Sequence, residues 1–445
     1  MSRIITIISL FKEIFNLTLN KDTSLLNTDR VDQIYDTLIS LGPIYIKFSQ
    51  LLAQKTDLFT DYEYLKIKLS TLQTDNKFHS LEDTETIFSN NFRCDMNKFF
   101  LHFQSEPIHS GSISQTYIVL LPGDENKYLM KIKHPNIKNE INFNVNEFKK
   151  IALILKKKFY SSLNGIDINE FLNQLEKQTN FLNEVTYNNS IIQSFNLKKQ
   201  LDTSLKVPFI KACSQDIIIQ EWCSGYHYYQ FIEKYPTLKL RSKIIAAKSF
   251  LELLYLYKIL HMDCHNGNIL YNIDTQGKII TTFVDFGLAN YVTLKDLDII
   301  SNLIRAINEK SSTLLFSTIY LCCYISKDQN LKIDTLFKPN EIEDFFNLEK
   351  NKESFIFIKN ILNKLNNNGI KINNNILYTL INLSLILESI DQNYNLDISI
   401  FDLIINEIIT DNKLLYQEHF KYIIDENKFK NKQKIIFEFY KNNDS

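Results

Sequence analysis

One stretch of the chain limits its chemistry and its fold more than any other. Residues 261–268 read H-M-D-C-H-N-G-N, and residues 285–287 read D-F-G after a predicted hairpin. Phosphoryl transfer requires an acid near the reacting oxygen and metal ligands that help to neutralise phosphate charge. We therefore predict Asp263 as the catalytic-loop acid and Asn268 and Asp285 as oxygen ligands of Mg²⁺. An isolated D-F-G could equally be an ordinary turn after a strand, and the motif upstream of it favours metal binding.

A lysine for binding phosphates is expected on an earlier strand. Residues 128–133 read Y-L-M-K-I-K and close a predicted hairpin. We predict that Lys131 is this residue. Because Lys133 points to the same face of an ideal strand, the choice between the two lysines rests on their position in the kinase lysine motif and not on strand periodicity. Glu184, on a following helical stretch, is the predicted carboxylate partner of this lysine; the alternative is a solvated helix residue.

A loop rich in small residues precedes the first of these strands, at residues 107–115. Its glycine and small hydroxyl residues would let backbone N–H groups approach phosphate oxygens, although this pattern is weak by itself. The residues that we expect to contact a nucleotide here are Ser110, Gly111, Ser112, Ser114 and Gln115, joined by Glu221 at the end of a later strand.

Hydrophobic periodicity orders the rest of the chain as helices, then a small sheet with helices, then a helix-dominated region. Helices are predicted over 31–72, broken at Gly42-Pro43, and over 81–92, 141–159, 168–195, 311–326, 372–387 and 413–445. Strands are predicted over 112–121, 128–133, 206–211, 217–222, 269–272 and 279–284. This order predicts an α+β fold.

Composition excludes several classes of protein. Lys+Arg 50 against Asp+Glu 51 gives a net charge of -1, so we expect no nucleic-acid partner. The 6 cysteines lack C-x-x-C spacing, which indicates neither a zinc site nor a disulfide framework and suits an intracellular, reducing compartment.

Membrane segments are not expected from the sequence. Lys12 and Glu13 interrupt the apolar N-terminus, so we predict no secretory signal there. An N-terminal amphipathic helix could lie on a membrane or pack against the protein itself, through Ile4, Ile5, Ile8, Phe11 and Phe15. Since the uncharged stretches 311–326 and 372–387 are shorter than the roughly 18 to 20 residues of a spanning helix, we expect a soluble or peripheral membrane protein.

Together these motifs resemble the UbiB family of atypical kinase-like proteins, also called the ADCK or aarF-domain family. The catalytic loop of that family reads H-A-D-P-H-P-G-N, which is similar to residues 261–268. Its lysine strand V-A-V-K-V-Q-x-P is similar to residues 129–135, L-M-K-I-K-H-P. Its hallmark L-G-P-x-x-x-K-x-G-Q resembles residues 41–50, L-G-P-I-Y-I-K-F-S-Q, which residues 57–59, D-L-F, follow in a family-like way.

The resemblance implies a bilobal, protein-kinase-like fold with an N-terminal helical extension packed on the small lobe. It also implies that Lys47 and Gln50 of the extension face the nucleotide pocket, and that ATP (or another nucleotide) and Mg²⁺ are the cofactors. We predict the following parts: an amphipathic or flexible helix over 1–30, the extension over 31–100, the small lobe over 101–223 and the helical large lobe over 224–445.

Three departures from the family pattern affect the accessory motifs. Ser49 replaces a glycine, which adds a side chain where close helix packing is expected. Gln178 and Asn180 replace the two carboxylates of an E-x-D motif, and amides bind Mg²⁺ less strongly. His109-Ser-Gly-Ser112 replaces an alanine-rich loop, which leaves nucleotide preference open.

Several functions agree with these features. The leading hypothesis is an ATPase or a small-molecule or lipid kinase, in the setting of quinone or isoprenoid lipid metabolism that the resemblance implies, with a hydrophobic small molecule or a membrane surface as a partner. The alternative is a nucleotide-binding pseudokinase that acts as a scaffold or a lipid-binding module. Conventional protein kinase activity ranks third, because no A-P-E motif follows residues 285–287. A choline-kinase-like or aminoglycoside-kinase-like protein would not explain residues 41–50. Substrate and oligomeric state stay open.

Overall fold

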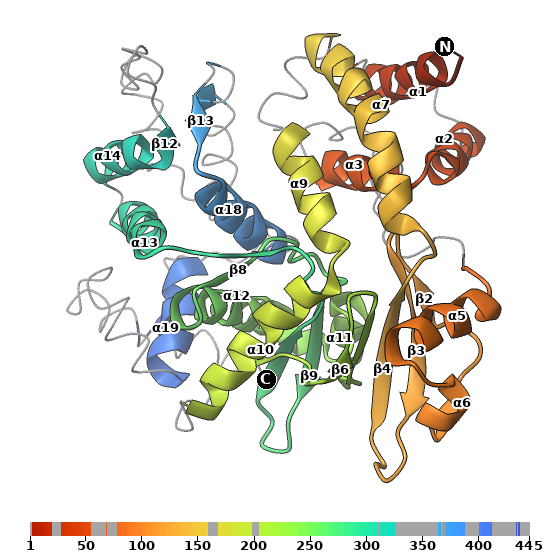
Figure 1. Cartoon of the computed structure of the whole chain (residues 1–445). Helices are drawn as coiled ribbons and strands as arrows, with labels where there is room; N and C mark the ends of the chain where they lie inside the picture. Colours follow the sequence, from red (N-terminus) through yellow and green to blue (C-terminus); the bar gives the residue numbers. More distant parts are fainter. Residues whose placement is uncertain are drawn as a thin grey trace. The chain divides into compact units, whose positions relative to one another are not determined.

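Contacts between residues divide the chain into two units, which we describe separately. The first comprises Met1–Val185 and Phe209–Trp222, and the second comprises Thr186–Pro208 and Cys223–Ser445. The structure is a computed structural model (Figure 1). It describes residues 2–19, 28–54, 68, 78–158, 168–197, 204–309, 311–324, 364–365, 368, 370–387, 400–411, 433 and 435–436. Most of the predicted helix over 413–445, residues 57–59 and most of 55–72 therefore lie outside the described part.

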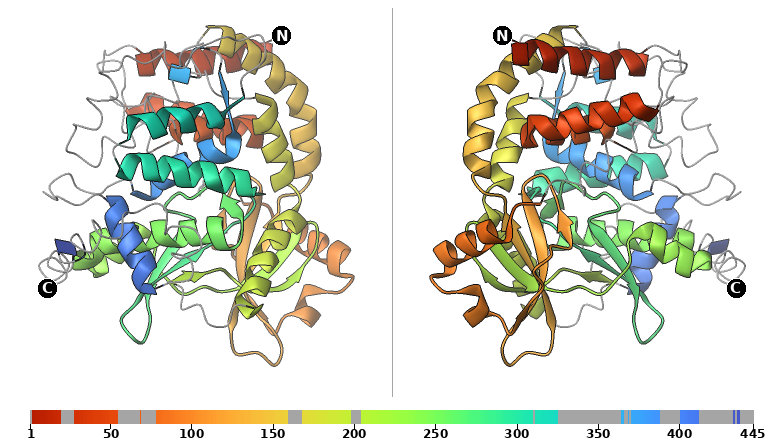
Figure 2. Two further views of the ribbon diagram at one scale, coloured as in Figure 1. Left: turned by 90° about the vertical axis from the view of Figure 1, so that its left-hand side faces the viewer. Right: turned by 90° about the vertical axis from the view of Figure 1, so that its right-hand side faces the viewer.

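Helices form one half of the first unit. They are α1 (Ser2–Leu19), α2 (Thr28–Leu41), α3 (Pro43–Gln54), α7 (Ile137–Lys158) and α9 (Ile168–Gln178). Their apolar faces share one core, which includes Phe48, Phe148 and Phe171, and Figure 2 shows these red and yellow helices from two sides. Ile113 of the predicted phosphate-binding loop belongs to the same core. The helical extension is thus packed on the small sheet's own loop, within one unit.

The other half of the first unit is an antiparallel sheet. Its strand order is β1-β3-β4-β7-β6, and β2 pairs with β3. The strands are β1 (His102–Phe103), β2 (His109–Ser110), β3 (Ser114–Leu120), β4 (Lys127–Lys133), β6 (Ile210–Cys213) and β7 (Ile217–Glu221). Helices α5 (Leu81–Phe92) and α6 (Met96–Phe99) cover it through an aromatic cluster around Phe88. Lys131 lies in β4, a strand that is paired on both sides and hence held firmly.

The sequence prediction of one helix over 168–195 is wrong. The structure has two helices, α9 and α10 (Phe181–Leu197), separated at Thr179-Asn180. The side-chain oxygen of Asn180 accepts a hydrogen bond from the backbone N–H of Leu182, as an N-cap residue does. A new helix therefore starts just before Glu184, which places that carboxylate in its first turn.

The second unit is built around α12 (Lys239–Leu256), which is buried along nearly its whole length. Around it lie the helices α11 (Tyr228–Lys234), α13 (Leu294–Asn308), α14 (Ser312–Cys322), α18 (Asn374–Leu387) and α19 (Ile400–Asp411) and a short 3₁₀ helix (Pro236–Leu238). Short strands complete the unit: β5 (Leu205–Lys206), β8 (Ile259–His261), β9 (Ile269–Ile273), β10 (Ile279–Phe283), β11 (Ala289–Tyr291), β12 (Cys323–Tyr324) and β13 (Lys371–Ile372). Segment 261–268 leads from β8 to β9, and segment 285–287 leads from β10 to β11. Because β8 pairs with β11 and β9 pairs with β10, both segments run between the same two small sheets.

The structure also corrects the strand predicted over 206–211. This segment is not one strand, because Lys206 pairs with β10 in the second unit and Ile210 pairs with β7 in the first.

Helix α1 packs against its own unit through Phe11 and Ile14, whereas Ile5 is 64% exposed. No helix among the described residues is long and apolar enough to cross a membrane. The predicted domain boundaries stay predictions.

Candidate functional site

In the first unit, Lys131 and Glu184 form a buried ion pair. The Lys131 ammonium lies 2.9 Å and 3.2 Å from the two carboxylate oxygens of Glu184. The side chains are only 12% and 5% exposed, and the ammonium lies 5.1 Å from the centre of the Phe181 ring. Two partly desolvated charges require such pairing, so the ammonium is held in one place. The structure brings together the two residues that the sequence paired; their role with a nucleotide remains a prediction.

Lys133, the alternative lysine, has a different partner. Its ammonium lies 2.7 Å from a carboxylate oxygen of Asp216 and 5.3 Å from the same Phe181 ring. Burial lowers the pKa of Lys133 even though the Asp216 carboxylate opposes that change. The two lysines do share one face of β4, as the alternation of strand residues predicts. Only Lys131 has a carboxylate from the first turn of a helix beside it.

A chain of hydrogen bonds holds the predicted phosphate-binding loop. Nε2 of the His134 ring lies 2.9 Å from the carbonyl oxygen of Gly111. Nδ1 of the same ring lies 2.8 Å from Nδ1 of His79. Because a carbonyl only accepts, His134 carries its hydrogen on Nε2, so His79 donates through Nδ1 and accepts from Thr84. Burial lowers the pKa values of both imidazoles, that of His79 to about 4, so the neutral forms that this chain needs are favoured.

The prediction that Gln115 contacts a nucleotide is wrong for its side chain. The amide is fully buried and hydrogen-bonds to Tyr117, Thr84 and the backbone of His79. It therefore closes the same network instead of facing a ligand. Ser114 and Gln115 belong to strand β3, within the strand predicted over 112–121.

The remaining predicted contacts of the loop differ in exposure. The hydroxyl of Ser110 is buried and lies 3.5 Å from His134 Nε2, and Ser114 is also buried. Ser112 and Gly111 are half-buried, and the Gly111 N–H donates to the carbonyl of Ser114. The loop is thus a tight turn, with Gly111 and Ser112 as its more accessible members.

Accessory residues of the first unit are placed as follows. Lys47 is half-buried on α3, and the side chain of Gln50 lies outside the described part of the structure. The Ser49 hydroxyl is completely buried and has no hydrogen-bond partner among the residues that the structure describes. Glu221 is exposed, and its carboxylate accepts from the N–H of Phe209 at 3.2 Å. The hydroxyl of Ser49 is therefore an unfavourable addition where the family has glycine.

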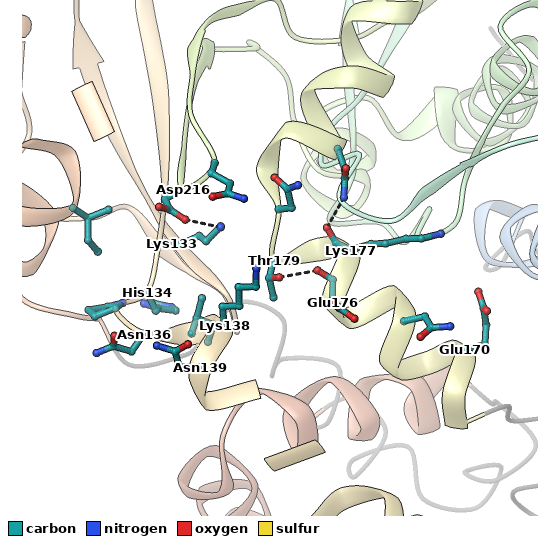
Figure 3. Close-up of a pocket in the computed structure, with 17 residues that line it drawn as sticks. Lys133, His134, Asn136, Lys138, Asn139, Glu170, Glu176, Lys177, Thr179 and Asp216 are labelled. Atoms are coloured by element: carbon teal, nitrogen blue, oxygen red, sulfur yellow. Dashed lines mark hydrogen bonds and ion pairs between the residues drawn. The ribbon is translucent and has the colours of Figure 1, made fainter. Parts of the chain in front are cut away.

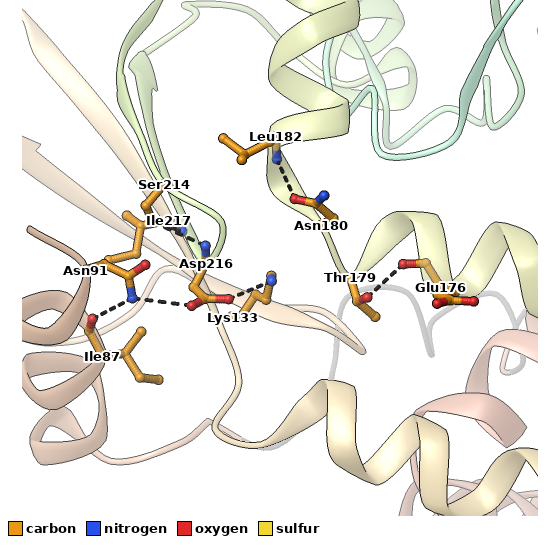
Figure 4. A network of polar contacts seen from close by, with 10 residues as sticks. All are labelled: Ile87, Asn91, Lys133, Glu176, Thr179, Asn180, Leu182, Ser214, Asp216 and Ile217. Atoms are coloured by element: carbon orange, nitrogen blue, oxygen red, sulfur yellow. Dashed lines mark hydrogen bonds and ion pairs between the residues drawn. The ribbon is translucent and has the colours of Figure 1, made fainter.

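A polar cavity of about 560 Å³ lies at the junction of α9 and α10 (Figure 3). It is lined by Lys133, Lys138, Lys177, Asp216 and Asn180 among others, and neither Lys131 nor Glu184 lines it. Figure 4 shows Asp216 between Lys133 and Asn91, with the amide of Asn91 donating at 3.3 Å. Asn180, where the family has a carboxylate, thus lies beside this cavity.

In the second unit, the catalytic-loop motif and the D-F-G motif are joined by their backbones. The N–H of Val284 donates to the carbonyl of Asn268 at 3.0 Å, next to Asp285 in the chain. His261 Nε2 donates to the carbonyl of Val284 at 3.1 Å, and its Nδ1 accepts from the N–H of Asp263. Burial lowers the pKa of His261, so a neutral imidazole bridges both motifs. These contacts place Asn268 and Asp285 side by side.

Asp285 has an unusual backbone. Its φ is 61°, in the left-handed region that residues other than glycine rarely adopt. Its Oδ1 accepts from the N–H of Gly287 at 3.2 Å. Strained backbones of this kind are concentrated at functional sites, so the observation is consistent with a constrained ligand.

The residues present fit one cation bound with a phosphate. The side-chain N–H of Asn268 donates to the Asp263 carbonyl at 3.0 Å, which turns its Oδ1 the other way. Asn268 and Asp285 would thus offer two hard oxygen ligands, and Mg²⁺ in such sites takes only one or two protein ligands beside phosphate and water. Within the described ranges, no three His, Cys, Asp or Glu side chains lie close enough to hold a metal alone. A protein-only metal cage is therefore not indicated there.

The catalytic-loop acid has a histidine neighbour. Asp263 Oδ2 lies 3.6 Å from Nε2 of His265, whose Nδ1 accepts from the N–H of Gly267 at 3.0 Å. A Cβ on Gly267 would come within 2.9 Å of the His265 ring, so any larger residue there would require this ring to shift. The loop therefore presents Asp263 and His265 together.

Two residues beside this loop escaped sequence reasoning. Asn382 of α18 accepts a hydrogen bond from the backbone N–H of Cys264 at 2.7 Å. Lys243 of α12, which is fully buried, donates to the side chain of Asn266 at 3.0 Å and lies 3.8 Å from the centre of the Tyr228 ring. A polar residue on the buried face of a helix is the only sequence signal that either one offers.

Comparisons with known proteins identify the family. The ABC1 atypical kinase-like domain matches residues 71–316. An uncharacterized protein from the hydrogenase 1 5′ region of Clostridium pasteurianum is 25% identical over 396 residues, which cover 86% of this chain and 71% of that protein. The probable protein kinase UbiB of Blochmanniella pennsylvanica is 25% identical over 268 residues, covering 58% of this chain and 48% of that one.

A yeast protein and a solved structure are also similar to this chain. An ABC1 family protein of Saccharomyces cerevisiae, described as mitochondrial, is 25% identical over 290 residues, 58% of this chain and 42% of its own length. A solved structure of a Mycobacterium tuberculosis protein in complex with erythromycin has a TM-score of 0.47 and 16% identity, covering 69% of this chain and 80% of that one. This chain spans about half the length of the UbiB and yeast relatives. The predicted α+β, kinase-like fold is confirmed, and the chain belongs to the UbiB/ADCK family of ABC1 atypical kinase-like proteins.

Proposed function

We propose that this chain is an ATP- and Mg²⁺-dependent enzyme of the atypical kinase type, either an ATPase or a small-molecule or lipid kinase. The observation that carries the proposal is the buried pair of Lys131 and Glu184. A buried ion pair contributes little to stability compared with apolar packing, so its presence favours a functional role for the ammonium. The adjacent oxygen ligands of Asn268 and Asp285 support the same proposal.

Each of these residues has a role that its contacts suggest. The Lys131 ammonium would bind phosphate oxygens, and Glu184 would keep it oriented. Asn268 and Asp285 would hold Mg²⁺, which neutralises charge on the phosphates when bound. Asp263, with its carboxylate beside His265, would accept the proton of an attacking hydroxyl or water, as an acid at this position of a kinase loop does.

The substrate that we propose is small and hydrophobic, in the setting of quinone or isoprenoid lipid metabolism. The description of the UbiB relatives as probable protein kinases supports a kinase-like activity at the level of the family only. The resemblance of residues 41–50 to the hallmark of the family extension supports a pocket closed to peptides. A hydrophobic molecule or a membrane surface is the partner that follows.

A pseudokinase without turnover is the second candidate, and the accessory motifs favour it. Gln178 is buried and Asn180 caps α10, so neither position supplies the carboxylate that the family has there. The buried, unpartnered hydroxyl of Ser49 adds a second defect. Such a protein would bind a nucleotide and act as a scaffold or a lipid-binding module.

Turnover of ATP separates the two candidates. We expect hydrolysis above that of the Asp263→Asn variant, with or without vesicles of phospholipid and a short-chain quinone. Binding of Mg-ATP in a thermal-shift experiment without any turnover above this variant would favour the pseudokinase. No binding at all would reject both candidates. If turnover is slow, Gln178→Glu combined with Asn180→Asp should raise it, since the two changes restore the missing carboxylates.

A further inference from the structure

The peptide group between Asp263 and Cys264 is held at both of its ends. Its carbonyl oxygen accepts from Nδ2 of Asn268 at 3.0 Å. Its N–H donates to Oδ1 of Asn382 at 2.7 Å, across 118 positions of sequence. The first bond comes from a candidate metal ligand, and the second comes from helix α18.

The orientation of both amides follows from their partners. Asn382 is completely buried, and its Nδ2 donates to the carbonyl of Tyr378 at 2.7 Å. Since a carbonyl can only accept, Oδ1 of Asn382 must face the N–H of Cys264. The same argument turns Nδ2 of Asn268 toward the Asp263 carbonyl and leaves its Oδ1 for another partner. One peptide thus links Asn382 to the oxygen of Asn268.

This arrangement depends on a departure from the family pattern. The family loop H-A-D-P-H-P-G-N has proline at the position of Cys264, and proline has no N–H to donate. In this chain the N–H exists and lies beside a side chain that is 1% exposed, so it requires an acceptor. Asn382 supplies that acceptor, and it restrains the peptide where a proline ring would otherwise fix the backbone. Hydrogen bonds in series also polarise one another, so a bond at the N–H strengthens the carbonyl as an acceptor for Asn268.

We propose that Asn382 is a positioning residue for the candidate metal site. It orients the peptide after Asp263, and through that peptide it orients the amide of Asn268 with the oxygen toward the cation. This inference rests on the proposed function, in which Asn268 binds Mg²⁺. The competing explanation is that Asn382 satisfies a buried N–H and contributes to stability alone.

The first measurement needs no ligand. Amide hydrogen exchange at Cys264 should be slow in the full-length protein and at least tenfold faster in Asn382→Ala. The matched control is Asn375→Ala, which removes an amide of the same helix that bonds to Asp296 and Asn290 instead. It should leave exchange at Cys264 unchanged. Equal exchange in the wild type and in Asn382→Ala would overturn the inference at its first step.

The second measurement is the Mg²⁺ concentration that gives half of the thermal stabilisation by saturating ATP. Loss of a residue that orients a metal ligand weakens metal binding roughly 10-fold to 100-fold, so we expect a shift of that order for Asn382→Ala. Asn375→Ala should lower the melting temperature without this shift. A normal midpoint in Asn382→Ala would leave only the structural explanation.

Cys264→Pro completes a double-mutant cycle and guards against a variant that does not fold. It removes the N–H, so Asn382→Ala should have no further effect on the Mg²⁺ midpoint when combined with it. The same shift in both backgrounds would show that Asn382 acts by another route and would overturn the inference. If the wild type itself shows no stabilisation by Mg-ATP, the proposed function fails, and the exchange data still report whether Asn382 holds the loop.

Discussion

At the scale of single residues, Lys131 and Lys133 offer a matched pair for testing the nucleotide site. Both ammoniums lie over the Phe181 ring, and each pairs with a carboxylate, Lys131 with Glu184 and Lys133 with Asp216. We expect Lys131→Met to abolish the stabilisation by Mg-ATP, which would be about 2.7 kcal/mol at a ligand concentration 100-fold above Kd. Lys133→Met should keep it, because Lys133 pairs with Asp216. Isothermal titration of each variant with Mg-ATP checks this prediction. If binding is kept in Lys131→Met and lost in Lys133→Met, the lysine that binds the nucleotide is Lys133.

Asp285 gives a second prediction at this scale, because its backbone is strained. Alanine and glycine at this position both remove the carboxylate, but only glycine adopts a φ of 61° without strain. We expect Asp285→Gly to be about 1 kcal/mol more stable than Asp285→Ala toward urea, while both lose the response to Mg-ATP. If the alanine variant is the more stable one, the left-handed conformation does not persist in solution.

At the scale of elements, the two imidazoles connect the start of α5, the end of β4 and the turn after β2. His79 has a pKa of about 4 in the folded chain against 6.5 ordinarily, because of burial and then the neighbouring His134. As the pH falls below 6.5, the unfolded chain takes up this proton first, so the free energy of unfolding decreases from pH 6.5 toward pH 4. We expect this decrease to be smaller in His79→Gln, as measured by urea unfolding at pH 7, 5.5 and 4.5. An equal decrease would show that the neutral pair does not exist.

Elements also show what sequence can and cannot predict. The helix over 81–92 and both hairpins were found because capping, periodicity and turn residues lie within each segment. The break between α9 and α10 was missed because Thr179-Asn180 contains neither Gly nor Pro. The burial of the Gln115 side chain was not predicted, because its partners, Thr84 and His79, lie more than 30 positions away. The role of Asn382 depends on a contact across 118 positions, which no local pattern encodes.

At the scale of the whole molecule, the candidate residues are divided between two units. Lys131 and Glu184 belong to the first unit, and Asn268 and Asp285 belong to the second. If all of them bind the same nucleotide, Mg-ATP should slow hydrogen exchange in β4 and in 263–268 together. We expect both effects to vanish in Asp285→Asn and in Lys131→Met. Slower hydrogen exchange in only one unit would mean that the candidate residues of the other unit do not bind the nucleotide.

Helix α10 is continuous in the chain, yet its first residues, up to Val185, count with the first unit and its later ones, from Thr186, with the second. The carboxylate that pairs with Lys131 therefore lies two residues before the point at which this helix passes into the second unit. Fraying of the helix at that point would loosen Glu184 and so the ammonium that the proposed chemistry needs.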